Sequence, residues 1–224
     1  MVDREKRRLQ DMTEQEFAAF LERNGQFHQQ VAEHLTLLAP QPQPRFDLAF
    51  RSALLSAEHS LAAFVLISGG MYAPGYTLLR PQFEMLVRGI WLMYAATDTW
   101  IEKLSRPLNN ETAEASKDAL MVADMLKGLR SSGSAPSALL DQLEACRDVM
   151  WKALNSYNHG GFHPLARFQT GYPRQLSYDV LRNSNAMLAL ASQLAAIVTG
   201  DRKNMVPVRT LHTDFADCLP IISQ

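Results

Sequence analysis

The segment of residues 74–96 constrains the fold more than any other part of the chain, because it is apolar on nearly every side. A helix of this kind is stable in water only when other elements cover it on several sides. We therefore expect a helix over residues 74–96 in the middle of a helical bundle. Its apolar side chains are Leu78, Leu79, Phe83, Met85, Leu86, Val87, Ile90, Trp91, Leu92, Met93 and Tyr94.

Helical periodicity continues on the N-terminal side of this segment. Thr13 and Glu16 form a capping-box pattern that predicts the start of a first long helix, and Pro40 is expected to end it. The sequence APQPQPR that follows cannot continue a helix and predicts a stiff corner. After this corner, Asp47 is expected to cap a second helix that runs towards Gly69.

The second half of the chain also shows helical spacing, whereas strand alternation appears nowhere over a useful length. These patterns predict an all-α fold: a single-domain, mostly antiparallel helical bundle over residues 1–224, with residues 1–12 as a charged lead-in and residues 47–199 as the bundle core. We expect helices at about residues 99–104 and 110–130, and a third that Ser134 and Pro136 open and that ends near Gly160. After a loop of about fifteen residues, a further helix is expected from a cap at Ser177 to Gly200, and a weaker one at 208–219.

The composition suits a soluble protein that buries a sizeable core, since 47% of its residues are hydrophobic and 20% are charged. A net charge of -1 argues against a broad basic surface, so any contact with RNA is expected to be local. Cys146 and Cys218 lie far apart, which favours neither a disulfide framework nor a zinc knuckle. The charged N-terminus, and the lack of about 18 uncharged apolar residues in a row, predict a cytoplasmic protein with no membrane partner.

Three charged residues interrupt the apolar helix predicted at residues 74–96. Arg80, Glu84 and Arg88 are spaced at i, i+4 and i+8 and therefore form one stripe. Pro81 cannot donate a hydrogen bond to the carbonyl of Thr77, so an unpaired acceptor and a kink are expected beside the stripe. Two interpretations stay open: a buried ion network that sets the packing register, or a set of side chains that faces a ligand.

The sequence LNSYNHGGFHPLAR, residues 154–167, places a histidine at the end of another predicted helix. Gly160 and Gly161 can take the left-handed conformation that closes a helix, and they allow a substrate to approach His159. His159 could act as an acid or base near neutral pH, or could simply cap the last carbonyls. Asn155 and Lys152 precede it on the same helical face.

Other chemical motifs are weak or absent. His163 stands four residues after His159, but the glycines between them break the helix and no third ligand is evident, so we expect no metal site and no cofactor. The sequence contains no GxSxG elbow, no phosphate-binding loop and no dinucleotide-binding fingerprint. The remaining histidines are expected at the surface or at an edge of the bundle: His28, His34, His59 and His212.

The sequences LLRPQFEMLVRGIWL, LNSYNHGGFHPLAR and LRNSNAMLAL together resemble those of a family of uncharacterised bacterial all-helical proteins. That family in turn resembles the higher eukaryotes and prokaryotes nucleotide-binding (HEPN) superfamily, helical bundles found among toxins and phage-defence ribonucleases. The resemblance covers roughly residues 47–199. It implies a HEPN-like effector that cleaves RNA without a metal ion and acts as a homodimer.

Active members of that superfamily carry an arginine a short distance before a histidine on one helix. His159 matches the histidine, but Lys152 is the nearest basic residue before it, and Arg147 is too far back. We therefore expect Arg80 or Arg88 to supply the missing cation from the neighbouring helix.

The full set of expected site residues comprises His159, Arg80, Glu84, Arg88 and Asn158 as catalytic groups, with Lys152 and Asn155 as substrate-binding groups. A histidine with one or two arginines is the minimum that a cleavage of RNA by its own 2′-hydroxyl requires. Asn158 or Asn155 is expected to orient the phosphate or the imidazole. The alternative function is a non-catalytic helical module that forms a homodimer or binds a protein partner.

Overall fold

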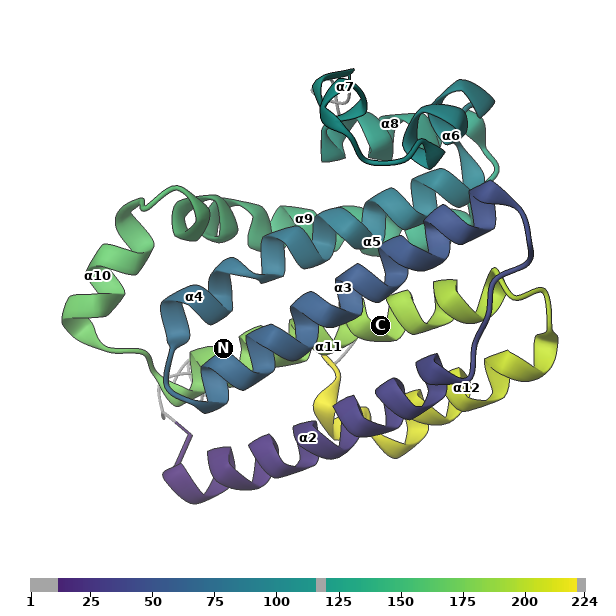
Figure 1. Cartoon of the computed structure of the whole chain (residues 1–224). Coiled ribbons are helices and arrows are strands. Elements are labelled where there is room, and N and C mark those ends of the chain that lie inside the picture. Colours follow the sequence, from purple (N-terminus) through teal and green to yellow (C-terminus); the bar gives the residue numbers. More distant parts are fainter. Residues whose placement is uncertain (1–11, 116–119, 221–224) are drawn as a thin grey trace.

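The computed structural model describes residues 12–115 and 120–220 of the chain (Figure 1). The described residues form α-helices, two short 3-10 helices and connecting turns, with no strand among them, which confirms the all-α single-domain prediction. The predicted charged lead-in lies outside the described residues except for Met12.

Helix α5, Leu79–Tyr94, lies at the centre of the bundle as its apolar surface predicts. It packs against α3, Pro44–Ser68, and α11, Arg174–Ile197, and these two helices also pack against each other. Helices α8, Val122–Ser132, and α9, Ser137–Asn158, cover another side of α5. Figure 1 shows α5, α3 and α11 running side by side through the middle of the molecule.

The outer layer completes the bundle on the far side of α11. Helix α2, Glu14–Thr36, and helix α12, Met205–Asp214, both pack against α11 (Figure 1). The predicted capping box at Thr13 is present and opens α2, although the helix ends before Pro40. The shorter elements are α6, Asp98–Ser105, and the 3-10 helices η1, Arg202–Asn204, and η2, Ala216–Cys218.

Close packing in the centre depends on one glycine of α5. A Cβ atom at Gly89 would lie 2.7 Å from Leu194 Cδ2 and 3.1 Å from Ser52 Cβ, so any larger residue would push α5 away from α11 and α3. Interiors packed to this density accommodate added atoms only with strain. Gly89 therefore sets the distance between the three central helices.

The predicted helix at residues 74–96 is divided in the structure. Helix α4, Tyr72–Thr77, ends at Leu78, and α5 begins at the next residue. Pro81 lies in the first turn of α5, where it lacks the N–H that would otherwise bond the carbonyl of Thr77. The expected interruption beside Arg80 is therefore present.

Several predicted helix boundaries were wrong because prolines start helices more readily than the polar residues after them. Helix α3 begins at Pro44, ahead of the predicted cap Asp47, and α11 follows Pro173, ahead of the predicted cap Ser177. The Ser177 hydroxyl is instead buried against Tyr76 Oη, at 2.8 Å.

The secondary structure predicted for two further segments was also wrong. The single helix expected at 110–130 contains α7, Asn110–Ala115, and α8, and the extended backbone at Met121 precedes α8. The loop expected after Gly160 contains the helix α10, Phe162–Thr170. Proline is compatible with a first helical turn, so Pro164 does not prevent this helix.

Two histidines expected at the surface or an edge are buried. His28 stacks on the Phe64 ring at 4.9 Å between centroids, and His34 is also buried on α2. Burial lowers the pKa of His28 to about 4, an effect that the nearby Asn185 side chain opposes. Burial also lowers the pKa of His34. His212 is exposed as expected, and His59 is half-buried.

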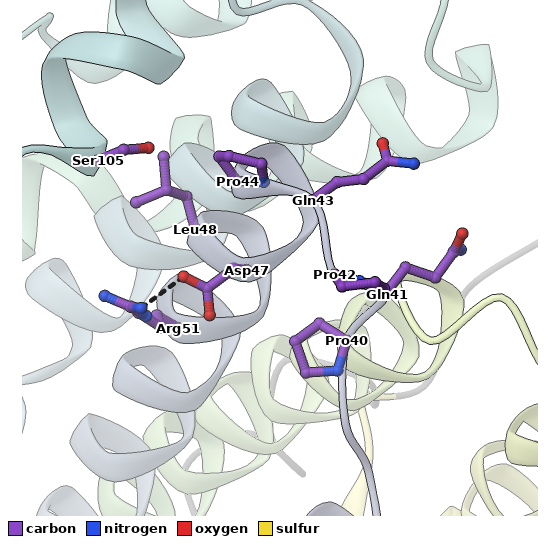
Figure 2. Close-up of a pocket in the computed structure, with 9 residues that line it drawn as sticks. All are labelled: Pro40, Gln41, Pro42, Gln43, Pro44, Asp47, Leu48, Arg51 and Ser105. Atoms are coloured by element: carbon purple, nitrogen blue, oxygen red, sulfur yellow. Dashed lines mark ion pairs between the residues drawn. The ribbon is translucent and has the colours of Figure 1, made fainter.

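The corner between α2 and α3 encloses a surface hollow of about 430 Å³ (Figure 2). Its walls come from the segment that begins at Pro40 and from the first turns of α3. Asp47 and Arg51, one turn apart on α3, pair at 2.5 Å on one wall, as Figure 2 shows, so these two charges neutralise each other. The backbone N–H of Gln41 donates to the carbonyl of Val198 at 3.1 Å and attaches the corner to the end of α11.

Among the described helices, only α3 is long and apolar enough to cross a membrane by length and composition. Core helices of soluble proteins pass the same test, and α3 packs against both α5 and α11. A cytoplasmic location without a membrane partner stays a prediction.

Candidate functional site

Arg80 makes three polar contacts, one within α5 and two with the end of α9. Its Nε donates to Glu84 Oε1 at 2.8 Å, and its Nη1 donates to Asn155 Oδ1 at 2.9 Å. The same Nη1 lies 2.9 Å from His159 Nε2. The guanidinium carbon also lies 5.0 Å from the centre of the Trp151 ring, within the range of cation–π attraction. Arg80 therefore brings one residue of α5 and three of α9 into a single cluster.

Helical spacing on both helices explains why this cluster forms. Arg80 and Glu84 are one turn apart on α5 and form an i, i+4 ion pair. Trp151, Asn155 and His159 are each four residues apart and share one face at the end of α9. Because α9 packs against α4 and α5, this face meets the guanidinium of Arg80.

The contact between Arg80 and His159 defines the protonation state of the imidazole in this conformation. A guanidinium has only donors, so His159 Nε2 must accept through its lone pair. A hydrogen bond in this geometry requires the tautomer that carries its proton on Nδ1. Its side chain is exposed, and its backbone N–H closes α9 by donating to the carbonyl of Asn155 at 3.1 Å.

The two glycines after His159 have different roles. Gly160 has a φ of +62°, the left-handed conformation that commonly ends a helix. Gly161 has an extended backbone, so only the first of the two glycines takes the left-handed conformation that was open to both. A Cβ atom there would lie 2.6 Å from Ser156 Oγ, which instead accepts from the backbone N–H of His163 at 3.0 Å. The pair turns the chain directly from α9 into α10.

The side-chain amide of Asn158 bonds to two backbone carbonyls and not to the imidazole of His159. Its Nδ2 donates to the carbonyl of Thr77 at 3.3 Å and to that of Leu154 at 2.9 Å. The first of these carbonyls is the one that Pro81 leaves without its helical donor. Asn158 thus satisfies an acceptor created by a proline on another helix and ties the end of α9 to the end of α4.

The other two basic residues of the expected site do not join Arg80. Arg88 lies two turns further along α5, and its Nη2 donates to the carbonyl of Leu120 at the long distance of 3.4 Å. Burial lowers the pKa of Arg88, and the charge of Glu84 opposes this. Lys152 is exposed on α9, one turn before Asn155. The cation beside His159 is therefore Arg80.

The cluster is only partly enclosed. The Arg80 side chain is 16% exposed and that of Glu84 is 31% exposed, while His159 lies open to solvent. Such an arrangement offers an anion a cation and a neutral imidazole side by side. Within the described ranges, no group of three or more histidine, cysteine or acidic side chains could hold a metal ion.

Sequence reasoning missed two features of the site. Trp151 lies beneath the guanidinium, and its position eight residues before His159 on the same helical face was a usable signal. The exposed residues of α10 were assigned to a loop, because the helix is short and its predicted start lacks a polar cap.

Comparison with known proteins gives one match. A family model described as a family of unknown function (DUF6988) matches residues 53–221, which include both α5 and α9. No curated protein matches the chain. No solved structure matches it either.

Proposed function

We propose that this chain, which belongs to the DUF6988 family of unknown function, is a HEPN-like effector that cleaves RNA without a metal ion. The observation that carries this proposal is the 2.9 Å contact between Arg80 Nη1 and His159 Nε2. It pairs a permanent cation with a neutral base at the surface of the bundle. The biological setting that fits such an activity is a toxin or a phage-defence system.

The proposed reaction begins when a phosphate of single-stranded RNA reaches Arg80. The anion competes for Nη1, and the imidazole that had accepted from this atom regains a free lone pair. His159 Nε2 then takes the proton of the 2′-hydroxyl as its oxygen attacks the adjacent phosphorus. The bond from phosphorus to the 5′-oxygen breaks, leaving a 2′,3′-cyclic phosphate, and the departing oxygen is protonated by the imidazolium or by water.

The neighbours of Arg80 would position it for this role. Glu84 accepts from Nε and therefore leaves the Nη edge directed at the end of α9. Asn155 Oδ1 accepts from Nη1 and limits the rotation of the guanidinium. Preorganised donors of this kind stabilise charge that develops in a transition state without having to reorient first.

A second candidate is a helical module with no catalytic activity. In its favour, Glu84 and Asn155 already accept from Arg80, an arrangement that could serve only to hold α5 against α9. A groove of about 460 Å³ between α9 and α11, lined by Leu143, Val149 and Met187 among others, could hold an apolar segment of a partner protein.

Incubation of the purified chain with a single-stranded RNA in the presence of a chelator tests the proposal. We expect fragments that end in a 2′,3′-cyclic phosphate, and we expect the His159→Ala variant to lose this activity while it keeps the melting temperature of the native chain. His212→Ala is the matched control, because that histidine is exposed on α12, which packs against α11. Equal cleavage by native chain and His159→Ala, or no cleavage by either, would refute the proposal.

A further inference from the structure

Helix α10 exposes nearly all of its apolar surface. It has no buried residue, and the exposed fractions are 79% for Phe162, 69% for Leu165 and 89% for Phe168. Figure 1 shows α10 at one end of the molecule, beyond the end of α9. Clustered apolar side chains left in water usually mark a surface that binds something.

The three exposed side chains lie on one side of α10. They are three residues apart, which places them within about a third of the helix circumference. The two phenylalanines are separated by about 9 Å along the axis, at 1.5 Å per residue. Both rings are therefore accessible to one extended ligand.

The charge around α10 favours an anionic ligand. Residues 149–178 contain no aspartate or glutamate, although they include Lys152, Arg167 and Arg174. Arg174 is engaged by Glu14 at 3.7 Å, whereas Arg167 belongs to α10 itself. Helix α10 thus carries a basic side chain, Arg167, next to Phe168, in a stretch of the sequence that has no acidic residue.

Helix α10 is also continuous with the Arg80–His159 cluster. Only Gly160 and Gly161 separate His159 from Phe162. The bond from the His163 N–H to Ser156 Oγ attaches the first turn of α10 to the last turns of α9. The His163 ring further lies 6.3 Å from that of Tyr157, between centroids. The first turn of α10 therefore lies against the end of α9 that precedes His159.

We infer that Phe162 and Phe168 are stacking sites for unpaired bases of single-stranded RNA whose backbone runs past Arg80. The inference rests on the proposed function and names the residues that hold the bases of its single-stranded substrate. Exposed aromatic rings beside basic side chains are the usual means of holding single strands, because every base has a face that can stack. A base in a duplex is already stacked on its neighbours and cannot use these rings.

The test measures binding apart from cleavage. The probe is a fluorescent single-stranded RNA with 2′-O-methyl groups, which lacks the attacking hydroxyl, and the protein is the full chain. Loss of one stacked base should weaken binding roughly 5- to 100-fold, so we expect Phe168→Ala to raise the dissociation constant within that range. Phe162→Ala should act in the same direction. The native chain should bind the same RNA in a duplex as weakly as these variants bind the single strand.

Two further variants separate stacking from apolar contact. Phe168→Leu keeps an apolar side chain without an aromatic face, so it should bind weakly, whereas Phe168→Trp should bind at least as well as the native chain. Leu165→Ala is the matched control, and its dissociation constant should stay within about twofold of the native value because a leucine cannot stack on a base as a ring does. All three residues are exposed, so the variants should fold.

Each outcome decides the inference. Unchanged binding by Phe168→Leu and Phe162→Ala, or no binding of the probe by the native chain, would overturn it. A loss with Leu165→Ala as large as with Phe168→Ala would also overturn it and would indicate a protein-binding surface, which sedimentation velocity would reveal if the partner were a second copy. Binding that needs Phe168, with no cleavage of unmodified RNA, would refute only the proposed nuclease.

Discussion

Arg80 Nη1 and His159 Nε2 lie 2.9 Å apart, although 79 residues separate them in the chain. The contact joins the first turn of α5 to the end of α9 and keeps the imidazole neutral while it lasts. Two effects of Arg80 can be separated: one on stability and, in the proposed reaction, one on the availability of His159 as a base.

Arg80→Ala should lower the free energy of unfolding by about 1–3 kcal/mol, because Glu84 and Asn155 lose a charged donor in a half-buried position. Urea denaturation measures this loss. Arg51→Ala removes a more exposed arginine that also pairs with an acid, and it should change the same quantity by less than about 1 kcal/mol. Equal losses in the two variants would show that the Arg80 contacts add no more to stability than an exposed ion pair does.

Gly161→Ala should destabilise the chain by about 1–3 kcal/mol, because the added Cβ would lie 2.6 Å from Ser156 Oγ and 3.2 Å from its Cα. Gly128→Ala provides a control of opposite sign. That glycine is inside α8, and its added Cβ would make only ordinary contact with Trp91 Nε1 at 3.5 Å, so alanine should stabilise by about 0.5–1 kcal/mol. Thermal unfolding of both variants checks the pair, and a neutral Gly161→Ala would contradict the close approach.

Asn158→Ala should cost about 1 kcal/mol of stability and leave the rate of RNA cleavage by the folded protein nearly unchanged. The amide donates to the carbonyl of Thr77 and not to the imidazole. The cost should shrink when Pro81→Ala is also present, because alanine restores a donor for that carbonyl. A large fall in kcat with an unchanged free energy of unfolding would instead support the catalytic role that the sequence predicted for Asn158.

Stability should fall as the pH drops from about 6.5 to about 4, because His28 stays neutral in the folded chain while the unfolded chain takes up its proton. The difference between these pKa values corresponds to about 3 kcal/mol, all of it present above pH 6.5 and lost by pH 4. His28→Phe retains a ring against Phe64 and should flatten the curve of unfolding free energy against pH. An unaltered slope in His28→Phe would assign the dependence to other groups.

Local patterns were sufficient to predict most of the long helices. The apolar surface of α5, the capping box at Thr13 and the interruption at Pro81 depend on residues within a few turns, and the structure has all three. Two local signals competed at the start of α3, and the helix begins at Pro44 instead of at the predicted cap Asp47. The exposed helix α10 was missed because its sequence contains glycine and proline signals that are typical of loops.

The sequence by itself determined the all-helical class, the central helix and the stripes that carry Arg80 and His159, because helical periodicity relates residues three and four apart. Only the tertiary structure decided that Arg80 contacts His159, that Arg88 donates to Leu120, and that His28 is buried. Those outcomes depend on how whole helices cross. Many side chains along both surfaces set that crossing together, so no short pattern records it.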